Sequence, residues 1–310
     1  MDPRQASAHL TRPLTARAGL IALLVSFLWS GNIVSIKFGL VAIPPFWSAF
    51  WRMLLGSVVV AAWSILRNDQ LFPARGEGRP FLVLGILFTA QIALFNLAVF
   101  YTSPAYAVIL LNTNPVFVNL ISHRYVPNDR ITPRRLLGLA VAFGGIVHVL
   151  QGQPEPGLAP DPALGNAFML ASSLLLASRI VYTQRLVNRT GPLRPVVWQM
   201  VASLPLFLGV AAVLEEPLVQ PLTAGPVVAM LYQAVVVAGF CFVVWTSLLQ
   251  HYSAGDLAMY GFTVPVFGVL LSAALFGERI TIRLAVGAAA VAAGIAIVTG
   301  SRGNAGRRGR

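Results

Sequence analysis

The sequence predicts an all-α membrane protein of ten transmembrane helices, arranged as two inverted five-helix repeats. Three observations lead to this prediction. The 310-residue chain is 57% hydrophobic and only 10% charged, with a mean hydropathy of +0.76, whereas about a quarter of the residues in a soluble domain are charged. Its apolar residues form separate runs long enough to cross a bilayer. One stretch of the sequence also occurs twice, with about half of the chain between the copies.

A transmembrane span needs about 20 mainly apolar residues to cross ~30 Å of hydrocarbon. We predict spans at residues 18–37, 46–66, 80–101, 104–123, 135–151, 163–184, 195–214, 226–250, 255–276 and 282–300. The first run is long and lacks a clear small-residue cleavage site. We therefore predict an uncleaved first helix and not a signal peptide.

A proline-rich segment divides the ten spans into two sets of five. The predicted regions are a cytoplasmic tail over 1–17, a first repeat over 18–151, a periplasmic linker over 152–162, a second repeat over 163–300 and a basic cytoplasmic tail over 301–310. The proline-rich composition of the linker is typical of a loop and not of a span.

The repeated stretch consists of a helix, a short charged turn and another helix. Its matched residues are Pro115 and Pro265, Arg130 and Arg279, Thr132 and Thr281, Gly138 and Gly287, and Gly145 and Gly294. Five spans separate the copies, so that one turn faces the cytoplasm and the other faces outward. Inverted halves of this kind build many transporters, with the substrate site between them.

The basic residues predict the orientation, because Lys and Arg collect in cytoplasmic loops. With the N-terminus inside, seventeen of the 22 basic residues fall on the cytoplasmic side, while Lys37, Arg279 and Arg283 fall outside. Both termini are then cytoplasmic, in what we expect to be a bacterial inner membrane. The net charge of +12 is explained by this distribution, so we predict no nucleic-acid partner.

The chemistry-bearing residues argue against an enzyme or a metal protein. Four histidines lie on separate segments and Cys241 is the single cysteine, so we predict no metal site and no cofactor. An intramembrane enzyme would need paired aspartates or a histidine–carboxylate set within the bilayer, and the predicted spans contain neither. The middle third of each span also lacks Asp and Glu, which favours uncoupled exchange or facilitated diffusion over proton coupling.

Polar and aromatic residues inside the spans are candidates for a substrate cavity, since a polar side chain in hydrocarbon needs a partner or water. The cavity candidates are Trp29, Asn32, Asn96, Tyr101, Asn112, Asn114, Tyr182, Trp245, Tyr260 and Thr263. Pro115 removes one backbone hydrogen bond and frees a carbonyl near Leu111. We predict that Pro115 and Pro265 act as matched hinges. The alternative is ordinary packing, since Asn bonds across helices and proline kinks are common in membranes.

Three charged residues lie near the predicted outer ends of the spans. Lys37 ends the first span, Arg52 lies roughly 9 Å into the second, and Glu278 follows the ninth. We predict an outer gate in which Arg52 and Glu278 pair. Two alternatives remain: Arg52 binds a substrate carboxylate directly, and Lys37 extends to the headgroups, as we expect of Arg179 at the other face.

Several of these residues together resemble the EamA family of the drug/metabolite transporter superfamily. They are Trp29 to Asn32, Lys37, Pro44-Pro45, Arg52, Asn96, Tyr101 to Ser103, Pro115 and Gly277 to Arg279. The resemblance covers residues 18–300. It implies a ten-helix fold with a central cavity, and the export or exchange of amino acids or other small metabolites. Two departures are Asn128-Asp129-Arg130, where Gly-Glu-Arg is common, and Leu175-Leu176, where span six usually has tryptophan.

The expected partners are a small-molecule substrate and the lipid bilayer, with the chain acting as a monomer or homodimer. A drug or nucleotide-sugar carrier is the alternative within transport. A non-transporting flippase-type subunit is the alternative outside it.

Overall fold

The computed structural model describes residues 15–125, 132–191, 193–252, 260–261 and 263–307. Every regular element in these ranges is a helix, and they contain no β-strand. The helices are α1 (Ala16–Gly39), α2 (Pro45–Leu66), α3 (Gly78–Tyr101), α4 (Pro104–Leu111), α5 (Asn114–Tyr125), α6 (Pro133–Leu150), the turn η1 (Pro156–Leu158), α7 (Pro162–Thr190), α8 (Leu193–Leu214), α9 (Ala224–Leu231), the π-helix η2 (Tyr232–Cys241), α10 (Phe242–His251), α12 (Thr263–Phe276) and α13 (Ile282–Arg307).

Eight helical stretches in the described part of the chain are long and apolar enough to cross a membrane. Two of them are composite, because α4 with α5 forms one and α9 runs through η2 into α10. Two shorter apolar helices, Thr263–Phe276 and Ile282–Ile297, coincide with the last two predicted spans. The start of predicted span nine lies outside the described residues.

Polar caps followed by proline set the starts of several helices. Ser103 accepts from the backbone N–H of Tyr106 ahead of Pro104, Thr132 caps α6 ahead of Pro133, and Asp161 caps α7 ahead of Pro162. Proline is favourable in the first turn, where its missing N–H has no helical partner. These local signals explain why the predicted spans begin within a few residues of the observed helices.

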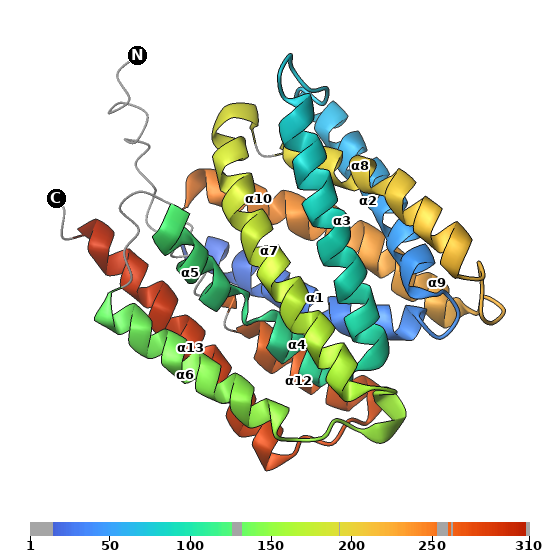
Figure 1. Ribbon diagram of the computed structural model, residues 1–310. Helices are drawn as coiled ribbons and strands as arrows, with labels where there is room; N and C mark the ends of the chain where they lie inside the picture. The colour runs from blue at the N-terminus through green and yellow to red at the C-terminus, as the bar shows by residue number, and fades with distance from the viewer. Residues whose placement is uncertain (1–14, 126–131, 192, 253–259, 262, 308–310) are drawn as a thin grey trace.

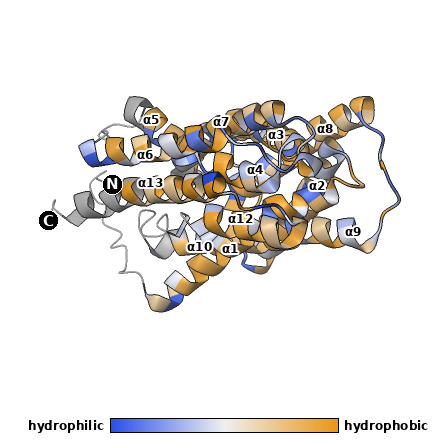
Figure 2. Cartoon of the chain, turned by 90° about the horizontal axis from the view of Figure 1, so that it is seen from below, coloured by the Kyte–Doolittle hydropathy of each residue, from blue (hydrophilic) through white to orange (hydrophobic). Residues whose placement is uncertain are grey.

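Helix α4 lies at the centre of the bundle. All its residues from Pro104 to Leu110 are buried, and it packs against α1, α7 and α12. On the outside, large apolar side chains such as those of Leu20, Val58 and Leu82 are exposed, and the helices in Figure 2 are hydrophobic along most of their length. An apolar outer surface of this extent is the surface that a lipid bilayer would cover.

The bundle has two ends. At the Glu278 end lie the connections 40–44, 102–103, 151–161, 215–223 and 277–281; at the Glu77 end lie the connection 67–77, the start of α1 and the junction of α7 with α8. Backbone hydrogen bonds join connections at the Glu278 end: Val219 donates to the carbonyl of Ala42 (2.9 Å) and Asp161 to that of Tyr101 (3.2 Å). The connection 215–223 is thereby joined to 40–44, and the connection 151–161 to the last residue of α3.

Helices α6 and α13 pack side by side in opposite directions (Figure 1) through the glycines of the repeat. A Cβ added at Gly145 would lie 2.9 Å from the carbonyl oxygen of Gly287, and one added at Gly294 would lie 2.6 Å from that of Gly138. Both distances are shorter than side chains tolerate, so glycine is required for this approach. The early glycine of each helix meets the late glycine of the other, which makes the pair antiparallel.

The other contacts between the first half (α1–α6) and the second half (α7–α13) form a reciprocal pattern. Helix α1 packs against α12 while α7 packs against α4 and α5; α1 also packs against α9 and η2 while α7 packs against α3. Likewise α2 contacts η2 and α8 contacts α3, and α2 contacts α8 directly. Exchanging each of these elements for its counterpart in the other half therefore reproduces the contacts just described.

Candidate transport site

The fourth span is broken, and Pro115 leaves the carbonyl of Leu111 without a backbone donor from the helix. Asn112 and Thr113 separate α4 from α5, one turn before Pro115. The carbonyl of Leu111 accepts from Ser173 Oγ at 3.1 Å and from Asn114 Nδ2 at 3.0 Å. The sequence analysis missed Ser173, for which the only signal was a Ser-Ser pair in an apolar span.

The hydroxyl of Ser173 also lies 2.7 Å from that of Thr113. Both side chains are buried, so helix α7 of the second half supplies polar partners to the break in the first. Asn112 and Asn119 donate to carbonyls of their own span, at Val108 and Pro115 (both 2.7 Å). The break is thus a polar, hydrogen-bonded point inside an apolar bundle, and its asparagines are held within it.

Aromatic rings form a second group beside the break-containing core. Trp29 on α1 lies 5.0 Å from Trp245 and 6.1 Å from Phe242, measured between ring centroids. One turn along α1, Asn32 has a buried side-chain oxygen without a hydrogen-bond partner. The sequence analysis missed Tyr232, whose hydroxyl donates to the carbonyl of Leu28 at 2.6 Å. The predicted residues Trp29, Asn32 and Trp245 therefore share one neighbourhood.

The remaining cavity candidates lie toward the two ends of the bundle. Asn96 and Tyr101 are in the last turns of α3, at the Glu278 end. Toward the Glu77 end, Tyr182 donates to the carbonyl of Pro80 (3.3 Å), Tyr260 lies against Gly19, and Thr263 donates to the carbonyl of Tyr260 (2.6 Å). The ten candidates are therefore spread along the length of the bundle and do not line one chamber.

Lys37 closes the C-terminal end of α3. Its Nζ donates to the carbonyls of Val99 (2.9 Å), Phe100 (2.8 Å) and Thr102 (3.0 Å). A cation is favourable there, because the last carbonyls of a helix lack partners and carry partial negative charge. Lys37 is therefore held between helices and does not extend to the headgroups.

Glu278 closes the N-terminal end of α4 in the complementary way. Its carboxylate accepts from the hydroxyls of Ser103 and Ser272 and from the backbone N–H of Ala105 (3.2 Å). The residue is 4% exposed. Gly277, with φ +67°, ends α12 in a left-handed turn that glycine adopts without strain and that carries the chain to Glu278. One carboxylate thereby joins α12 to the corner between α3 and α4.

Arg52 has different partners from those of Glu278, so the predicted pairing of the two is wrong for this structure. Its Nη2 donates to Asn96 Oδ1 at 3.0 Å, and Asn96 Nδ2 donates to the carbonyl of Pro45 at 2.7 Å. The guanidinium also lies over the ring of Phe95, 5.8 Å from its centroid. The physical reason is that the donors at the start of α4 already satisfy the carboxylate.

Arg179 also departs from expectation. Its Nη1 donates to Gln199 at 3.2 Å, and its guanidinium lies 4.9 Å from the ring centroid of Phe88. It is held by α8 and α3 and does not extend toward headgroups.

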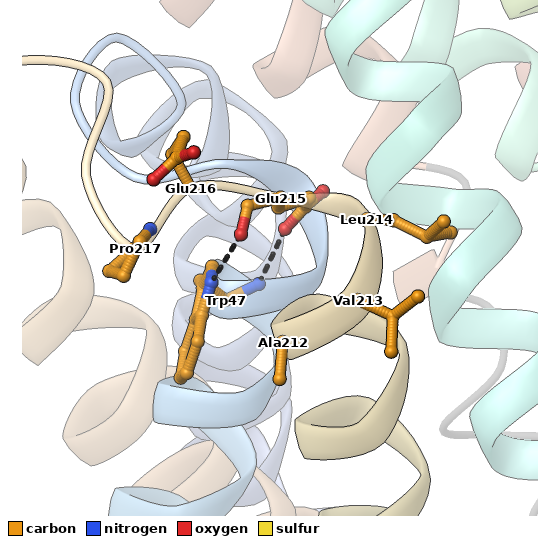
Figure 3. Close-up of a pocket in the computed structure, with 7 residues that line it drawn as sticks. All are labelled: Trp47, Ala212, Val213, Leu214, Glu215, Glu216 and Pro217. Atoms are coloured by element: carbon orange, nitrogen blue, oxygen red, sulfur yellow. Dashed lines mark hydrogen bonds between the residues drawn. The ribbon is translucent and has the colours of Figure 1, made fainter.

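A surface pocket of about 420 Å³ lies where α8 meets the start of α2 (Figure 3). Trp47, Ala212, Val213, Leu214, Glu215, Glu216 and Pro217 line it. Helix α2 begins at Pro44-Pro45 without a side-chain cap of its own. Glu215, directly after α8, supplies one by accepting from the N–H groups of Phe46 (2.9 Å) and Trp47 (3.0 Å). The sequence analysis missed this cap, whose signal was an acidic pair after an apolar span.

The described residues contain no group of three His, Cys, Asp or Glu side chains able to hold a metal ion. An all-helical bundle with an apolar surface, a broken span and buried charged groups belongs to the class of integral membrane transporters. The EamA-like transporter family matches residues 16–151 and 163–300. The chain belongs to this family, and the resemblance found in the sequence is confirmed.

Known relatives match nearly the whole chain. A protein of Salmonella typhimurium named "Probable amino-acid metabolite efflux pump" is 28% identical and covers 92% of this chain and 95% of its own. An "Uncharacterized transporter" of Archaeoglobus fulgidus is 25% identical, covering 92% and 98%. A crystal structure that is 20% identical has a TM-score of 0.69 over 91% of this chain and 96% of that one, which supports the fold alone.

Proposed function

We propose that the chain is an alternating-access exporter or exchanger of amino acids or related small metabolites. It crosses the membrane ten times, with both termini cytoplasmic and the Glu278 end outside. Two relatives, from Salmonella typhimurium and Escherichia coli, carry the name of amino-acid metabolite efflux pump, which supports this choice of substrate.

The reciprocal packing of the two halves is the observation that carries the proposal. Antiparallel contact of α6 with α13 through matched glycines, together with the exchanged contacts of α1 and α7, supports an inverted repeat. Two such halves have nearly equivalent ways of packing against each other. A site between them can therefore open first to one side of the membrane and then to the other.

In this cycle Lys37 and Glu278 hold the outer gate closed, each at one side of the Thr102–Ser103 corner. The break at Asn112 and Thr113, one turn before Pro115, acts as a hinge in the first half, and the matched Pro265 acts as the hinge in the second half. Substrate passes the polar and aromatic neighbourhood of Trp29, Asn32 and Trp245.

Reconstituted liposomes test the proposal. Purified protein is placed in liposomes loaded with one amino acid at a time, and the uptake of a labelled trace of the same amino acid is measured as counterflow. Exchange of at least one amino acid above protein-free liposomes is expected. Protein that stays folded and monodisperse but exchanges none of them would contradict the proposal.

A further inference from the structure

Arg52 is a buried cation to which the described residues supply no acidic partner. Its side chain is 3% exposed, and the ion pair between Arg194 and Glu77 does not involve it. Asn96 and the face of Phe95 are neutral, so they orient the guanidinium without balancing its charge. An isolated charge inside a membrane protein is costly unless something of opposite sign comes to it.

Unused polar atoms lie on α2, which carries this arginine, and on η2, which packs against α2. Arg52 Nε, Ser48 Oγ and both polar atoms of the Gln233 side chain are buried without a hydrogen-bond partner. Ser48 precedes Arg52 by four residues and so shares its face of α2. Gln233 is the second residue of η2, which packs against α2, and its Nε2 lies 3.5 Å from a Cβ built at Gly39 on α1. Four unpaired atoms on two packed elements are unusual, since most buried polar atoms are hydrogen-bonded.

Glu278, the acid that the sequence analysis paired with Arg52, is already hydrogen-bonded to other residues. Glu278 accepts hydrogen bonds from Ser103 and Ala105 at the start of α4 and from Ser272 on α12. It is therefore not available as a counter-ion to Arg52. Arg179 provides a comparison, because it too is held by a side-chain amide and a phenyl ring, those of Gln199 and Phe88. None of its nitrogen atoms, however, is among the described side-chain atoms that are buried without a hydrogen-bond partner.

We propose that Arg52 binds the carboxylate of the transported substrate, with Asn96 as a positioning residue and Ser48 and Gln233 as further polar contacts. The inference rests on the proposed transport function and narrows its substrate class to small monocarboxylates, amino acids among them. One guanidinium balances one negative charge, and its planar fork matches the two oxygens of a carboxylate.

The depth of Arg52 suits a transient site. It lies seven residues into α2, about 10 Å from the Glu278 end at 1.5 Å per residue. In the described state the side chain is covered. The carboxylate reaches it when contacts at that end separate, so binding and opening are linked.

Asn96→Asp is the sharpest test, because it places a carboxylate where an amide already lies 3.0 Å from the arginine. This internal counter-ion should compete with a substrate carboxylate. The substitution also replaces the Nδ2 donor that bonds the carbonyl of Pro45, so the melting temperature is measured to establish that the variant is folded. Leucine and leucinamide serve as the first probe pair, since the amide keeps the ammonium and the side chain and lacks only the negative charge. Other amino acids are tested with their amides in the same way.

Two readouts are taken for each pair: counterflow in liposomes, and the rise in melting temperature of the purified protein with added probe. Wild type should prefer at least one acid over its amide by about tenfold or more, as expected for a charge-assisted hydrogen bond. Asn96→Asp should abolish that preference while retaining a cooperative melting transition. Arg52→Lys keeps the positive charge but lacks the planar guanidinium, so it should retain part of the preference for the acid.

Arg179→Gln is the matched control, because it removes a similarly held guanidinium and should leave the preference for the acid unchanged. An unaltered preference in folded Asn96→Asp, or no preference in wild type, would overturn the inference. If the acid but not the amide raises the melting temperature, and no counterflow occurs, Arg52 would be supported as the carboxylate site and the proposal of transport would be contradicted. The two failures are therefore distinguishable.

Discussion

For Glu278, the sequence predicted an electrostatic contact but not the residues that make it. A lone acid after an apolar span, at the level of Lys37 and Arg52, indicates an electrostatic contact. The contact that forms is with the start of α4, because Ser103 and Ala105 present donors at a helix N-terminus, where negative charge is favoured. Such partners lie more than 170 residues away in sequence, and no local pattern reveals them.

We expect Glu278→Gln to open the outer gate. It removes charge-assisted bonds worth about 1.5–3 kcal/mol each, so the corner between α3 and α4 should separate more often. Cysteine placed at Ala107, which is 0% exposed, should then react faster with an impermeant thiol reagent. Glu216→Gln, at an exposed acid of the 215–223 connection, should change nothing, and equal reactivity in the two variants would contradict the gate.

Glu215 provides a pH prediction. Burial raises the pKa of its carboxyl, against the opposing hydrogen bonds from the N–H groups of Phe46 and Trp47. A raised folded-state pKa stabilises the protein fully below the ordinary value, and this stabilisation is lost as pH rises through the raised value. Between pH ~4 and ~7, the melting temperature of wild type should fall relative to that of Glu215→Gln. A constant difference across this range would exclude the effect.

At the scale of elements, hydropathy was enough to place most helices. The predicted span 46–66 became α2 (Pro45–Leu66), and 195–214 became α8 (Leu193–Leu214). The π-helix η2 was not predicted, because the hydropathy of an apolar run does not indicate which carbonyl each backbone N–H will bond. The break in span four was predicted from Pro115, since a missing N–H is visible in sequence; its partner Ser173 was not.

Pro115→Ala should slow transport more than it weakens substrate binding. The substitution restores an N–H that can bond the carbonyl of Leu111, now held by Ser173 and Asn114, and so joins α4 to α5. Pro265→Ala should act alike in the second half. Counterflow rate and ligand-induced melting shift separate the two effects.

Pro205→Ala is the control for both hinges, because Pro205 lies inside α8 and has no counterpart in the repeat. Its flux should stay near that of wild type. If all three variants transport equally well, the repeated prolines serve packing alone.

At the scale of the whole molecule, the predicted inversion gives a direct topology test. Cysteine at Arg283, which is exposed at the Glu278 end, should react in intact cells with an impermeant reagent. Cysteine at Arg134, in the first turn of α6, should react only after the cells are opened. The native Cys241 is buried and gives little background. The reverse labelling pattern would exclude the proposed orientation.

The duplication could be predicted from sequence because the copies keep their glycines and prolines in register. The candidate site could be predicted only in part: Trp29, Asn32 and Trp245 share one neighbourhood, whereas Asn96 instead orients Arg52. Composition identifies which side chains are costly in a bilayer. It does not say which of them satisfy one another after the helices have packed.

The contact of α6 with α13 has one consequence for the origin of the chain. Gly145 meets Gly287 as Gly294 meets Gly138, so each helix offers the other the same surface that it receives. Such a contact is isologous, the type that builds twofold homodimers. A single five-helix ancestor carrying this surface would be complementary to a copy of itself inserted upside down in the same membrane. Fusion of two such copies then preserves the original dimer interface inside one polypeptide.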